Sequence, residues 1–469
     1  MEKAKIGLIG LAVMGANLAR NIANKKFPIV VYNRTTEKTD KFIEEFSNKN
    51  LEGSKTLKEF VSKIAKPRKI IIMVQAGAAV DSVIKQLTPL LDKNDLIIDC
   101  GNSNYKDTQN RFTQLKEKGL QFIGCGVSGG EEGALNGPSL MPGGSQQSYK
   151  KLEPIFKKIA AKDFNRKPCV TYIGNNGAGH YVKTVHNGIE YAVMQMMAEA
   201  YDILRTIYKL KPSEIAKIFE KYNKGPLASY LFEIGTEVLN KKDEFKSTKH
   251  LIDFILDKAA QKGTGTWTAI DALEHGTALP TITEAVFARL LSSEKEKRIT
   301  LSKIYKKPKL TKKIPLTTFT KVLESALYAG MLSAYAQGYA LIANTAKEEK
   351  WDINLSEVSR IWEGGCIIRA EILNFLHKTF KKSKPETHLF EIPEVTKAMK
   401  KSIPSLRELI AYTALNAIAT PSLSTALSYF ESITQENLPA NFIQGLRDYF
   451  GAHTYERTDK EGHFHTDWQ

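Results

Sequence analysis

Cysteine is scarce in this 469-residue chain, and its four copies, Cys100, Cys125, Cys169 and Cys366, lie far apart. Because no two of them form a Cys-x-x-Cys pair, neither a disulfide framework nor a zinc site is predicted. No apolar run approaches the ~20 residues that a membrane-spanning helix requires. The start Met passes almost directly into a strand-like run, which leaves no room for a cleavable leader. We therefore expect a reduced, cytoplasmic protein with no membrane partner.

Acidic residues are fewer than basic ones, 51 against 67, which gives a net charge of +16. A basic surface attracts anions of every kind, including nucleic acids and phosphorylated metabolites. Much of the excess lies in short lysine runs, such as Lys306 with Lys307 and Lys381 with Lys382, which are typical of a solvated surface. Since no zinc-finger or RNP-type motif accompanies the charge, we predict no nucleic-acid partner.

The first part of the chain alternates short β-rich runs with segments of helical length. This alternation predicts a doubly wound, mostly parallel sheet. The composition, 42% hydrophobic and 25% charged, is that of a globular protein, and the length predicts two or three domains. The expected strands are residues 5–9, 29–32, 69–74, 96–100, 121–125 and 169–173, and the expected helices are residues 14–25, 36–47, 79–91 and 106–118.

After Gly179 the pattern becomes helical, and strand signals are scarce. Apolar residues recur at roughly 3.6-residue intervals between Val182 and Ile207, which predicts one long, largely buried helix. Residues 198–201 resemble residues 336–339, and 210–220 resemble 354–363, which suggests two related halves. Chance similarity between buried helices is the alternative.

These patterns divide the chain into three expected parts. Residues 1–178 are expected to form the α/β domain, and residues 179–438 a large all-α substrate and dimerisation domain with the internal repeat. Residues 439–469 form a C-terminal tail, in which residues 449–457 are rich in aromatic and polar groups but have no clear helical period. Because exposed aromatic side chains are costly, we expect the tail to pack on another surface.

A glycine-rich loop directly follows the first expected strand. It is the dinucleotide-binding G-x-G-x-x-G fingerprint with Ala12 at its middle glycine. Gly10 would make the tight turn, Gly15 would let the helix pack closely on the sheet, and the helix N-terminus would face a pyrophosphate. Within a βαβ pattern, this motif predicts a Rossmann-type domain. The expected cofactor-binding residues here are Gly10, Leu11, Ala12, Val13, Met14 and Gly15.

The residues after the second expected strand indicate which cofactor binds. They are Asn33, Arg34 and Thr35, with no carboxylate to bind a ribose 2′-hydroxyl. A guanidinium can hold a 2′-phosphate through two hydrogen bonds, and the two neighbouring side chains offer neutral donors. The alternative is that Arg34 lies on an ordinary surface turn. Its position relative to the glycine loop favours NADP over NAD.

Further loops follow expected strands at the edge where open sheets bind ligands. Small residues and amides there would let backbone donors approach a carboxylate or the nicotinamide ribose. Each loop by itself is an ordinary turn, but together they outline a site. The candidate residues are Val74, Gln75 and Ala76, then Asn102, then Ser128, Gly129 and Gly130.

A polar stripe interrupts the long apolar helix. It comprises Lys183, His186, Asn187, Glu190 and Tyr191, at positions i, i+3, i+4, i+7 and i+8. Lys183 and Glu190 therefore differ by about 20° around the axis and ~10 Å along it, so both can reach one small substrate. A solvent-facing stripe with a charge pair is the alternative. The repeat weighs against it, because the corresponding stretch of the second half keeps only the lysine.

Several motifs now stand in order along almost the whole chain. They are Gly10-Leu-Ala-Val-Met-Gly15, Asn33-Arg34-Thr35, Gly126-Val-Ser-Gly-Gly-Glu-Glu-Gly-Ala134, Lys183-x-x-His186-Asn187-Gly-Ile-Glu190-Tyr191, Lys262-Gly-Thr-Gly265 and Phe450-Gly-Ala-His-Thr-Tyr-Glu-Arg457. Together they resemble the 6-phosphogluconate dehydrogenase family. Related 3-hydroxyacid dehydrogenases share the glycine loop and the lysine, but lack the Asn-Gly-Ile-Glu-Tyr stretch and the long tail.

The resemblance implies an NADP-dependent oxidoreductase that converts 6-phosphogluconate to ribulose 5-phosphate and CO2 in the pentose phosphate pathway. It also implies a homodimer in which each tail reaches the neighbouring subunit's site. The implied substrate-binding residues are Asn102, Ser128, Gly129, Gly130, His186, Asn187, Tyr191, Lys262 and Arg289, with Arg447 and His453 supplied by the tail. Gln75, Thr266 and the pair Ala192-Val193 depart from the commoner family pattern.

The residue types support a three-step reaction with Lys183 and Glu190 as catalytic residues. Neutral Lys183 would accept the C3 hydroxyl proton during hydride transfer, if desolvation and nearby cationic groups lower its pKa. As an ammonium it would assist the loss of CO2 from the 3-keto acid, and Glu190 would then protonate C1 of the resulting enediol. No cluster with metal-ligand spacing is evident, so a metal-free reaction is predicted. The alternatives are a 3-hydroxyacid dehydrogenase for a small unphosphorylated acid and a non-catalytic NADP-binding module.

Overall fold

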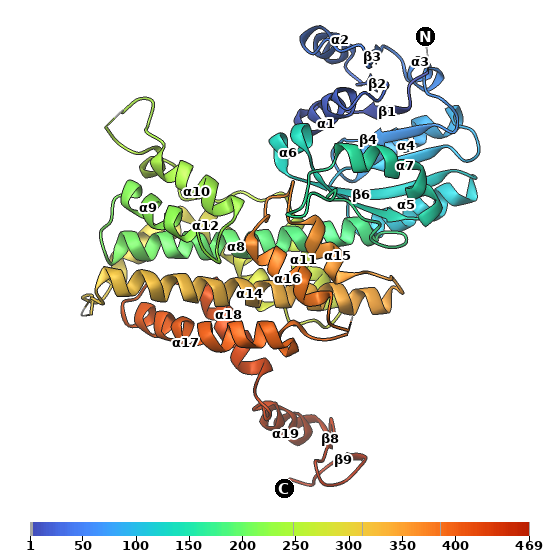
Figure 1. Ribbon diagram of the computed structural model, residues 1–469. Coiled ribbons are helices and arrows are strands. Elements are labelled where there is room, and N and C mark those ends of the chain that lie inside the picture. Colours follow the sequence, from blue (N-terminus) through green and yellow to red (C-terminus); the bar gives the residue numbers. More distant parts are fainter. Residues whose placement is uncertain (1–2, 247, 312, 385, 469) are drawn as a thin grey trace.

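The structure is a computed structural model that describes residues 3–246, 248–311, 313–384 and 386–468. An α/β part comes first, a helical part follows, and the chain ends in a small tail (Figure 1). Within the described residues, no helix is both long and apolar enough to cross a membrane.

Seven strands of the described chain form one sheet in the order β3-β2-β1-β4-β5-β6-β7. Neighbouring strands are parallel except for β6 and β7, which are antiparallel. The strand order reverses between β1 and β4, and such a switch point leaves a crevice for a ligand at the carboxyl ends of the strands. The strands are β1 (Ile6–Ile9), β2 (Ile29–Tyr32), β3 (Leu51–Ser54), β4 (Lys69–Ile72), β5 (Leu96–Asp99), β6 (Gln121–Ser128) and β7 (Ser139–Gly144).

Apolar strands and two helical layers build this part of the molecule. Ile70, Ile71 and Ile72 of β4 are fully buried, as expected for a parallel strand that is covered on both faces. The arrangement confirms the predicted doubly wound, mostly parallel sheet. The helices are α1 (Val13–Asn24), α2 (Thr36–Glu45), α3 (Leu57–Ser62), α4 (Ala78–Leu87), the 3-10 helix η1 (Thr88–Leu90), α5 (Tyr105–Glu117), α6 (Gly130–Asn136) and α7 (Gln146–Ile159).

One predicted strand is wrong, and two strands are additional to the prediction. Residues 169–173 form no strand in the described structure, because Val170 and Gly174 make only isolated bridges to β7. The additional strands are β3, Leu-Glu-Gly-Ser, and β7, Ser-Leu-Met-Pro-Gly-Gly. Both lack β-branched residues, and proline and glycine normally indicate turns, so neither shows the usual strand pattern.

A 29-residue helix, α8 (Ala178–Thr206), begins the helical part and confirms the predicted long, largely buried helix. Most of the helices that follow pack their apolar faces with it in one core. These are α9 (Pro212–Tyr222), α10 (Tyr230–Asn240), η2 (Leu251–Asp253), α11 (Thr264–Glu274), α12 (Pro280–Ser293), α14 (Leu316–Glu348), α15 (Leu355–Ile361), α16 (Glu371–Phe380), η3 (Leu389–Glu391), α17 (Pro393–Leu415) and α18 (Pro421–Ile433). Helix α13 (Lys295–Ile304) has no buried residue and lies outside this core.

The order of these elements agrees with the predicted internal repeat. The series α8, α9, α10, η2, α11, α12 is followed by the similar series α14, α15, α16, η3, α17, α18. Glu199 of α8 accepts hydrogen bonds from the backbone N–H groups of Ser422 and Leu423, at 2.8 and 3.0 Å, at the start of α18. Gln337 of α14 accepts one from Thr281, at 2.9 Å, at the start of α12. Each long helix therefore caps a helix that belongs to the other half.

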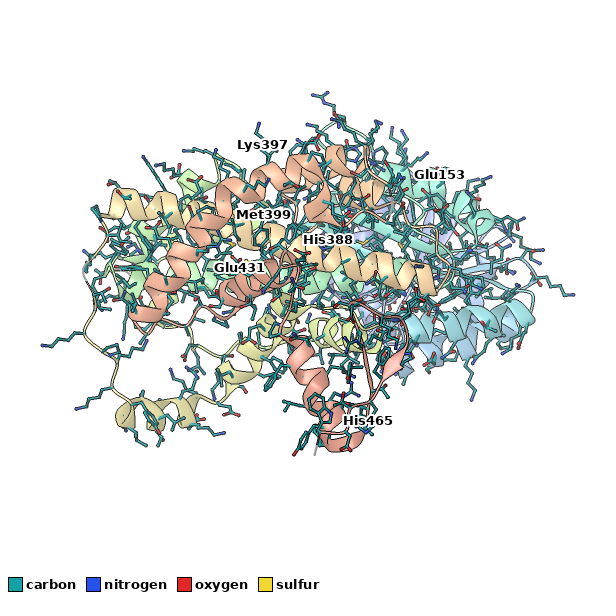
Figure 2. The ribbon with its side chains drawn as sticks, turned by 90° about the horizontal axis from the view of Figure 1, so that it is seen from below. Glu153, His388, Lys397, Met399, Glu431 and His465 are labelled. Atoms are coloured by element: carbon teal, nitrogen blue, oxygen red, sulfur yellow. The ribbon has the colours of Figure 1, made fainter. Side chains whose placement is uncertain are left out.

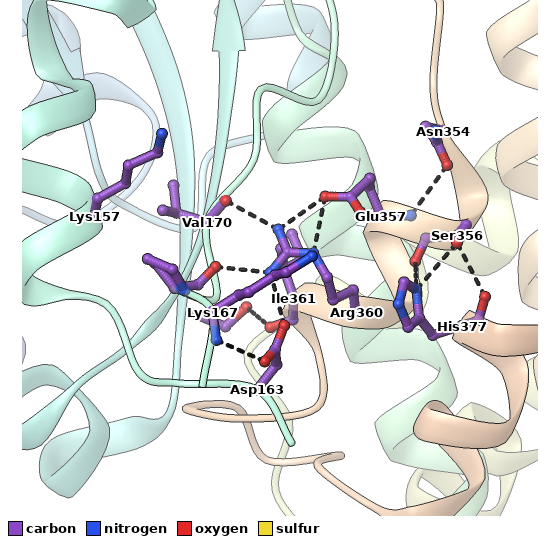
Figure 3. A network of polar contacts seen from close by, with 12 residues as sticks. Lys157, Asp163, Lys167, Val170, Asn354, Ser356, Glu357, Arg360, Ile361 and His377 are labelled. Carbon is purple, nitrogen blue, oxygen red and sulfur yellow. Dashed lines mark hydrogen bonds and ion pairs between the residues drawn. The ribbon is translucent and has the colours of Figure 1, made fainter. Parts of the chain in front are cut away.

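A buried guanidinium joins the α/β part to the helical part (Figure 3). Arg360 of α15 donates hydrogen bonds to Asp163 at 3.1 Å and to the carbonyl oxygens of Pro168 and Val170 at 2.8 and 3.3 Å. Its Nε–H binds Glu357 on the same helix at 2.9 Å. Since residues 163–170 follow the sheet, this side chain fixes the sheet against the second half of the repeat.

The tail contains the helix α19 (Ala440–Gly451) and a hairpin of β8 (Tyr455–Glu456) and β9 (His463–Phe464). It extends beyond the helical body, away from the sheet (Figure 1), and Figure 2 shows His465 on the tail, apart from Met399 and Glu431 on α17 and α18. The helix ends at residue 451, within the stretch 449–457 that shows no clear helical period in the sequence. Phe442 and Phe450 remain 70% and 71% exposed, so the described part of this chain does not cover them.

One buried carboxylate holds the tail together. Asp448 of α19 accepts hydrogen bonds from the backbone N–H groups of Thr454 and Thr466, each at 3.0 Å. It also binds Trp468 Nε1 and His465 Nδ1, each at 2.9 Å. Because the bonds reach both sides of the hairpin, helix and hairpin form one folded unit.

Candidate active site

The glycine-rich loop between β1 and α1 requires glycine at two positions. Gly10 has φ +103°, and a Cβ there would lie 2.3 Å from the carbonyl oxygen of Met73. A Cβ on Gly15 would lie 1.9 Å from the carbonyl oxygen of Gly10. Ala12 is the exposed N-cap residue of α1, so its methyl group points away from these close contacts. The loop and the N-terminus of α1 have the geometry of a phosphate-binding turn.

The residues after β2 stand beside this loop. Asn33 Oδ1 accepts a hydrogen bond from the backbone N–H of Leu11 at 3.2 Å, so Asn33 braces the glycine loop. Arg34 and Thr35 are exposed at the carboxyl end of β2, next to β1 in the sheet. The first turn of α1 contains no acidic residue in this structure. This combination of exposed cation and helix N-terminus fits a cofactor that carries phosphates at both positions.

The other predicted loops follow β4, β5 and β6, which are neighbours in the sheet. Gln75 and Asn102 are exposed at the ends of β4 and β5, while Ser128 is buried at the end of β6. The first two loops touch, because a Cβ on Gly101 would lie 3.2 Å from the carbonyl oxygen of Val74. The predicted cofactor and substrate loops therefore share one edge of the sheet.

Helix α8 lies directly against β6 and β7, because glycines line the contact. A Cβ on Gly179 of α8 would lie 2.2 Å from the carbonyl oxygen of Met141 in β7. A Cβ on Gly126 of β6 would lie 2.4 Å from Cβ of Lys183. This close approach places the polar stripe of α8 beside the loop after β6.

The stripe forms a compact polar cluster. Lys183 Nζ donates a hydrogen bond to Ser128 Oγ at 3.1 Å and lies 3.4 Å from His186 Nδ1. The same imidazole nitrogen lies 3.2 Å from Asn187 Oδ1 and 3.8 Å from Glu190 Oε2. The imidazole of His186 therefore stands between the lysine and the carboxylate.

Burial moves the pKa values of this cluster toward the neutral forms. Desolvation lowers the pKa of Lys183, although the negative charge of Glu190 opposes this shift. Desolvation raises the pKa of Glu190, opposed by Lys183 and Arg289. Desolvation, and then the charge of Lys183, lower the pKa of His186 well below its usual value. Of the two causes expected from the sequence, desolvation lowers the pKa of Lys183, while no cationic group of the described chain contributes to the shift.

Tyr191 and Arg289 continue the site along α8. The guanidinium of Arg289 on α12 lies 3.5 Å above the ring of Tyr191, and its Nη1 donates to the carbonyl oxygen of Ala260 at 3.2 Å. Helix α11 also packs on this ring, because a Cβ on Gly265 would lie 2.6 Å from it. Lys262 is exposed and lies in the loop between Ala260 and Gly265. The structure therefore brings Arg289, and the loop that carries Lys262, near Glu190 and Tyr191.

Residues 362–369 also contact the site, although the sequence prediction does not include them. A Cβ on Gly129 would lie 2.6 Å from the carbonyl oxygen of Gly365, and one on Gly130 would lie 3.7 Å from Cδ1 of Ile367. The adjacent glycines 364 and 365 are the signal that a close backbone approach occurs here.

The structure does not bring Arg447 and His453 to this cluster. Both lie on the tail and are exposed. Arg447 binds Gln444 within its own helix, and the ring of His453 packs against Phe450. Within the described chain, the tail extends away from the sheet (Figure 1).

Comparison with known proteins agrees with this architecture. Residues 5–174 match the family "NAD binding domain of 6-phosphogluconate dehydrogenase", and residues 179–468 match "6-phosphogluconate dehydrogenase, C-terminal domain". The decarboxylating 6-phosphogluconate dehydrogenase of Lactococcus lactis subsp. lactis is 47% identical over 469 residues, which cover 100% of this chain and 99% of that protein. The NADP(+)-dependent, decarboxylating enzyme of Bacillus subtilis is 47% identical over 473 residues, covering 100% of both chains.

A solved structure is similar over the same length. It is the 6-phosphogluconate dehydrogenase of Plasmodium falciparum, described with its cofactor NADP+ and its substrate 6-phosphogluconate. The TM-score is 0.95 at 42% identity, and the match covers 99% of this chain and 100% of that one. In sequence and in fold, the chain therefore belongs to the 6-phosphogluconate dehydrogenase family.

Proposed function

We propose that this protein catalyses the NADP-dependent oxidative decarboxylation of 6-phosphogluconate to ribulose 5-phosphate and CO2. The observation that carries the proposal is the buried cluster of Lys183, His186 and Glu190 at the loop after β6, in the same sheet whose β1 ends in the glycine-rich loop. Similarity to decarboxylating enzymes over the full length of the chain supports the same reaction.

The cofactor site is proposed to bind NADP. The turn at Gly10 and the start of α1 would hold the pyrophosphate, and Arg34 the 2′-phosphate. Bound NADP would accept the hydride from C3 of the substrate. The proposed contacts are Gly10, Leu11, Ala12, Val13, Met14, Gly15, Asn33, Arg34, Thr35, Val74, Gln75, Ala76 and Asn102.

Lys183 is proposed as the base for the C3 hydroxyl. Because burial lowers its pKa, its amine is more available to accept that proton than an ordinary lysine. Oxidation at C3 gives a β-keto acid, whose C1–C2 bond breaks to release CO2. The electron pair of that bond forms an enediol, and the Lys183 ammonium donates to its developing oxyanion.

Glu190 is proposed as the acid that completes the reaction. Its raised pKa favours the protonated form, so it can deliver a proton to C1 of the enediol, which was C2 of the substrate. Ribulose 5-phosphate is the product. His186, which lies between the two groups, would orient the substrate without carrying charge.

The remaining proposed contacts hold the rest of the substrate. Lys262 and Arg289 would bind the phosphate, for which a guanidinium offers bidentate geometry. The polar groups near the carboxylate and hydroxyls would be Asn102, Ser128, Gly129, Gly130, His186, Asn187 and Tyr191.

A homodimer is proposed to complete each site. Arg447 and His453 would reach the neighbouring subunit's substrate, since neither contacts the cluster of its own chain. The exposed apolar face of α19, with Phe442 and Phe450, supports a partner surface. On α12, Phe287 is also 56% exposed.

The division of the chain is proposed as residues 1–178 for cofactor binding, 179–438 for substrate binding and dimerisation, and 439–469 for the exchanged tail. The cytoplasm is the proposed compartment, because the four cysteines of the described chain are buried and not disulfide-bonded.

The test is to follow NADPH formation and CO2 release together with 6-phosphogluconate as substrate. We expect equal amounts of both products, loss of activity in Lys183→Met, and no turnover of unphosphorylated gluconate. NADPH without CO2 would instead indicate a simple 3-hydroxyacid dehydrogenase. NADPH binding without any turnover would indicate a non-catalytic cofactor module.

A further inference from the structure

A buried guanidinium on α5 contacts two of the loops at the edge of the sheet. Arg111 is 4% exposed. Its Nη2 donates to the carbonyl oxygen of Gly77 at 3.2 Å, in the loop after β4. Its Nη1 donates to Ser103 Oγ and to Asp99 Oδ2, each at 3.3 Å, in the loop after β5. One side chain therefore bridges the two loops.

Asp99 organises the second of these loops. It is fully buried at the end of β5, and its Oδ1 accepts a hydrogen bond from the backbone N–H of Gly101 at 3.0 Å. Its Oδ2 accepts one from Ser103 Oγ at 2.6 Å. These bonds shape the turn that leaves Asn102 exposed. A fully buried carboxylate needs a countercharge, which Arg111 provides.

The first loop depends on the same guanidinium. Gly77 has φ +85° and is the N-cap of α4, and Arg111 Nε also binds Asp81 on that helix at 2.7 Å. The loops contact each other where Gly101 approaches the carbonyl oxygen of Val74. A shift of either loop would therefore move the other.

We propose that Arg111 is a positioning residue, which holds the loops 74–77 and 99–103 in register and thereby sets the affinity of the site for the cofactor. The inference rests on the proposed function, which assigns Val74, Gln75, Ala76 and Asn102 to cofactor binding. Arg111 itself bonds to protein groups. Its planar fork sends separate N–H groups toward both loops, which the single ammonium of a lysine cannot reproduce.

Arg68 provides a matched control at the opposite end of the same strand pair. It precedes β4 and is 9% exposed. Its Nη1 donates to Asp95 Oδ2 at 2.7 Å and to Asp92 Oδ2 at 2.8 Å, beside the start of β5. Both buried arginines therefore link the β4 side to the β5 side, Arg68 through Asp95 and Arg111 through Asp99 and the Gly77 carbonyl. Only Arg111 lies at the carboxyl ends of the strands.

The experiment compares Arg111→Lys, Ser103→Ala and Arg68→Lys with the wild type. NADPH binding is titrated by fluorescence without substrate, and kcat and KM are measured for NADP and 6-phosphogluconate. We expect Arg111→Lys to weaken NADPH binding and to lower kcat/KM about 10- to 100-fold, since a displacement of about 1 Å can have an effect of this size. Ser103→Ala should produce a smaller change in the same direction. Arg68→Lys should lower Tm but leave NADPH affinity unchanged.

Equal losses of NADPH affinity in Arg111→Lys and Arg68→Lys would overturn the proposal, as would unchanged affinity in a folded Arg111→Lys. If Arg111→Lys does not fold, Ser103→Ala decides, because it removes a contact of the guanidinium with the second loop and keeps the arginine. Weaker NADPH binding then supports the proposal, and unchanged NADPH binding overturns it. If the wild type binds NADPH but does not oxidise 6-phosphogluconate, the proposed function fails, and the NADPH titration still decides the role of Arg111.

Discussion

Among single residues, the proposed base Lys183 and the proposed acid Glu190 share one buried site. In water, an amine near neutral pH is protonated and a carboxyl group is ionised. Burial shifts both pKa values toward neutrality in this cluster. The same desolvation therefore creates two complementary groups on one helix face.

Arg34 allows a test of cofactor choice at the same scale. We expect Arg34→Gln to lower kcat/KM for NADP roughly 10- to 100-fold, because a hydrogen bond to a charged group contributes about 1.5–3 kcal/mol. The value for NAD should stay unchanged, since NAD has no 2′-phosphate. Initial rates with each cofactor check this. Lys49→Gln, which removes an exposed cation before β3, is the control. Equal losses with both cofactors would contradict a 2′-phosphate contact.

Local spacing explains which site residues could be predicted from the sequence. Lys183 and Glu190 lie on one helix, so periodicity alone places them together. Gly365 meets Gly129 only because the chain folds back, and no spacing pattern reports a contact between residues so far apart. In the sequence, Arg111 likewise appears as an ordinary helix residue, because its contacts with Gly77 and Ser103 exist only in the folded chain.

Among the helices and strands, α8 connects the sheet to the rest of the molecule. Glycines bring it against β6 and β7, while Glu199 near its other end caps α18. The burial of Glu199 raises its pKa from its ordinary value of 4.5 to about 7. We therefore expect the connection between α8 and α18 to depend on pH.

Glu199→Gln tests this dependence. Between about pH 4.5 and 7 the folded protein holds a proton that the unfolded chain has lost, so the free energy of unfolding falls as the pH rises. Glutamine, which occupies the matching position 337, should remove up to about 3 kcal/mol of this decrease. Denaturant unfolding at both ends of the window measures it. The exposed Glu220→Gln is the control, and an unchanged pH slope in Glu199→Gln would contradict the assignment.

The regular elements could be predicted where the pattern is strong. The isoleucines of β4 and the apolar period of α8 indicate their structures directly. The strand β7 contains Pro142 and ends in two glycines, so tertiary pairing with β6 overrides its turn-like composition. The opposite occurs at residues 169–173, where an apolar run forms only isolated bridges.

In the whole molecule, the position of the tail predicts that subunits share their sites. Lys183→Met and His453→Ala should each be inactive, but a mixed dimer would combine an intact lysine with an intact partner tail. When equal amounts of the two variants mix at random, about half of the dimers contain one subunit of each. Each mixed dimer has one complete site and one incomplete site, so about one quarter of wild-type activity should return. Activity after joint refolding or coexpression measures this.

Lys183→Met mixed with Glu190→Gln is the matched control. Both changes lie in the same subunit's cluster, so no mixed dimer regains a complete site. If the first mixture also stays inactive while light scattering shows dimers, the tail does not act in the partner's site.

The bonds that Asp448 accepts within the tail also bear on the thermodynamics of subunit association. Ordering a backbone residue costs about 1–2 kcal/mol, and a disordered tail would incur that loss at the moment of association. Here helix and hairpin are already joined through Asp448, so the loss belongs to monomer folding. In the proposed dimer the tail would dock as a preorganised arm, and more of the interaction energy of its exposed aromatic face would remain available as affinity between subunits.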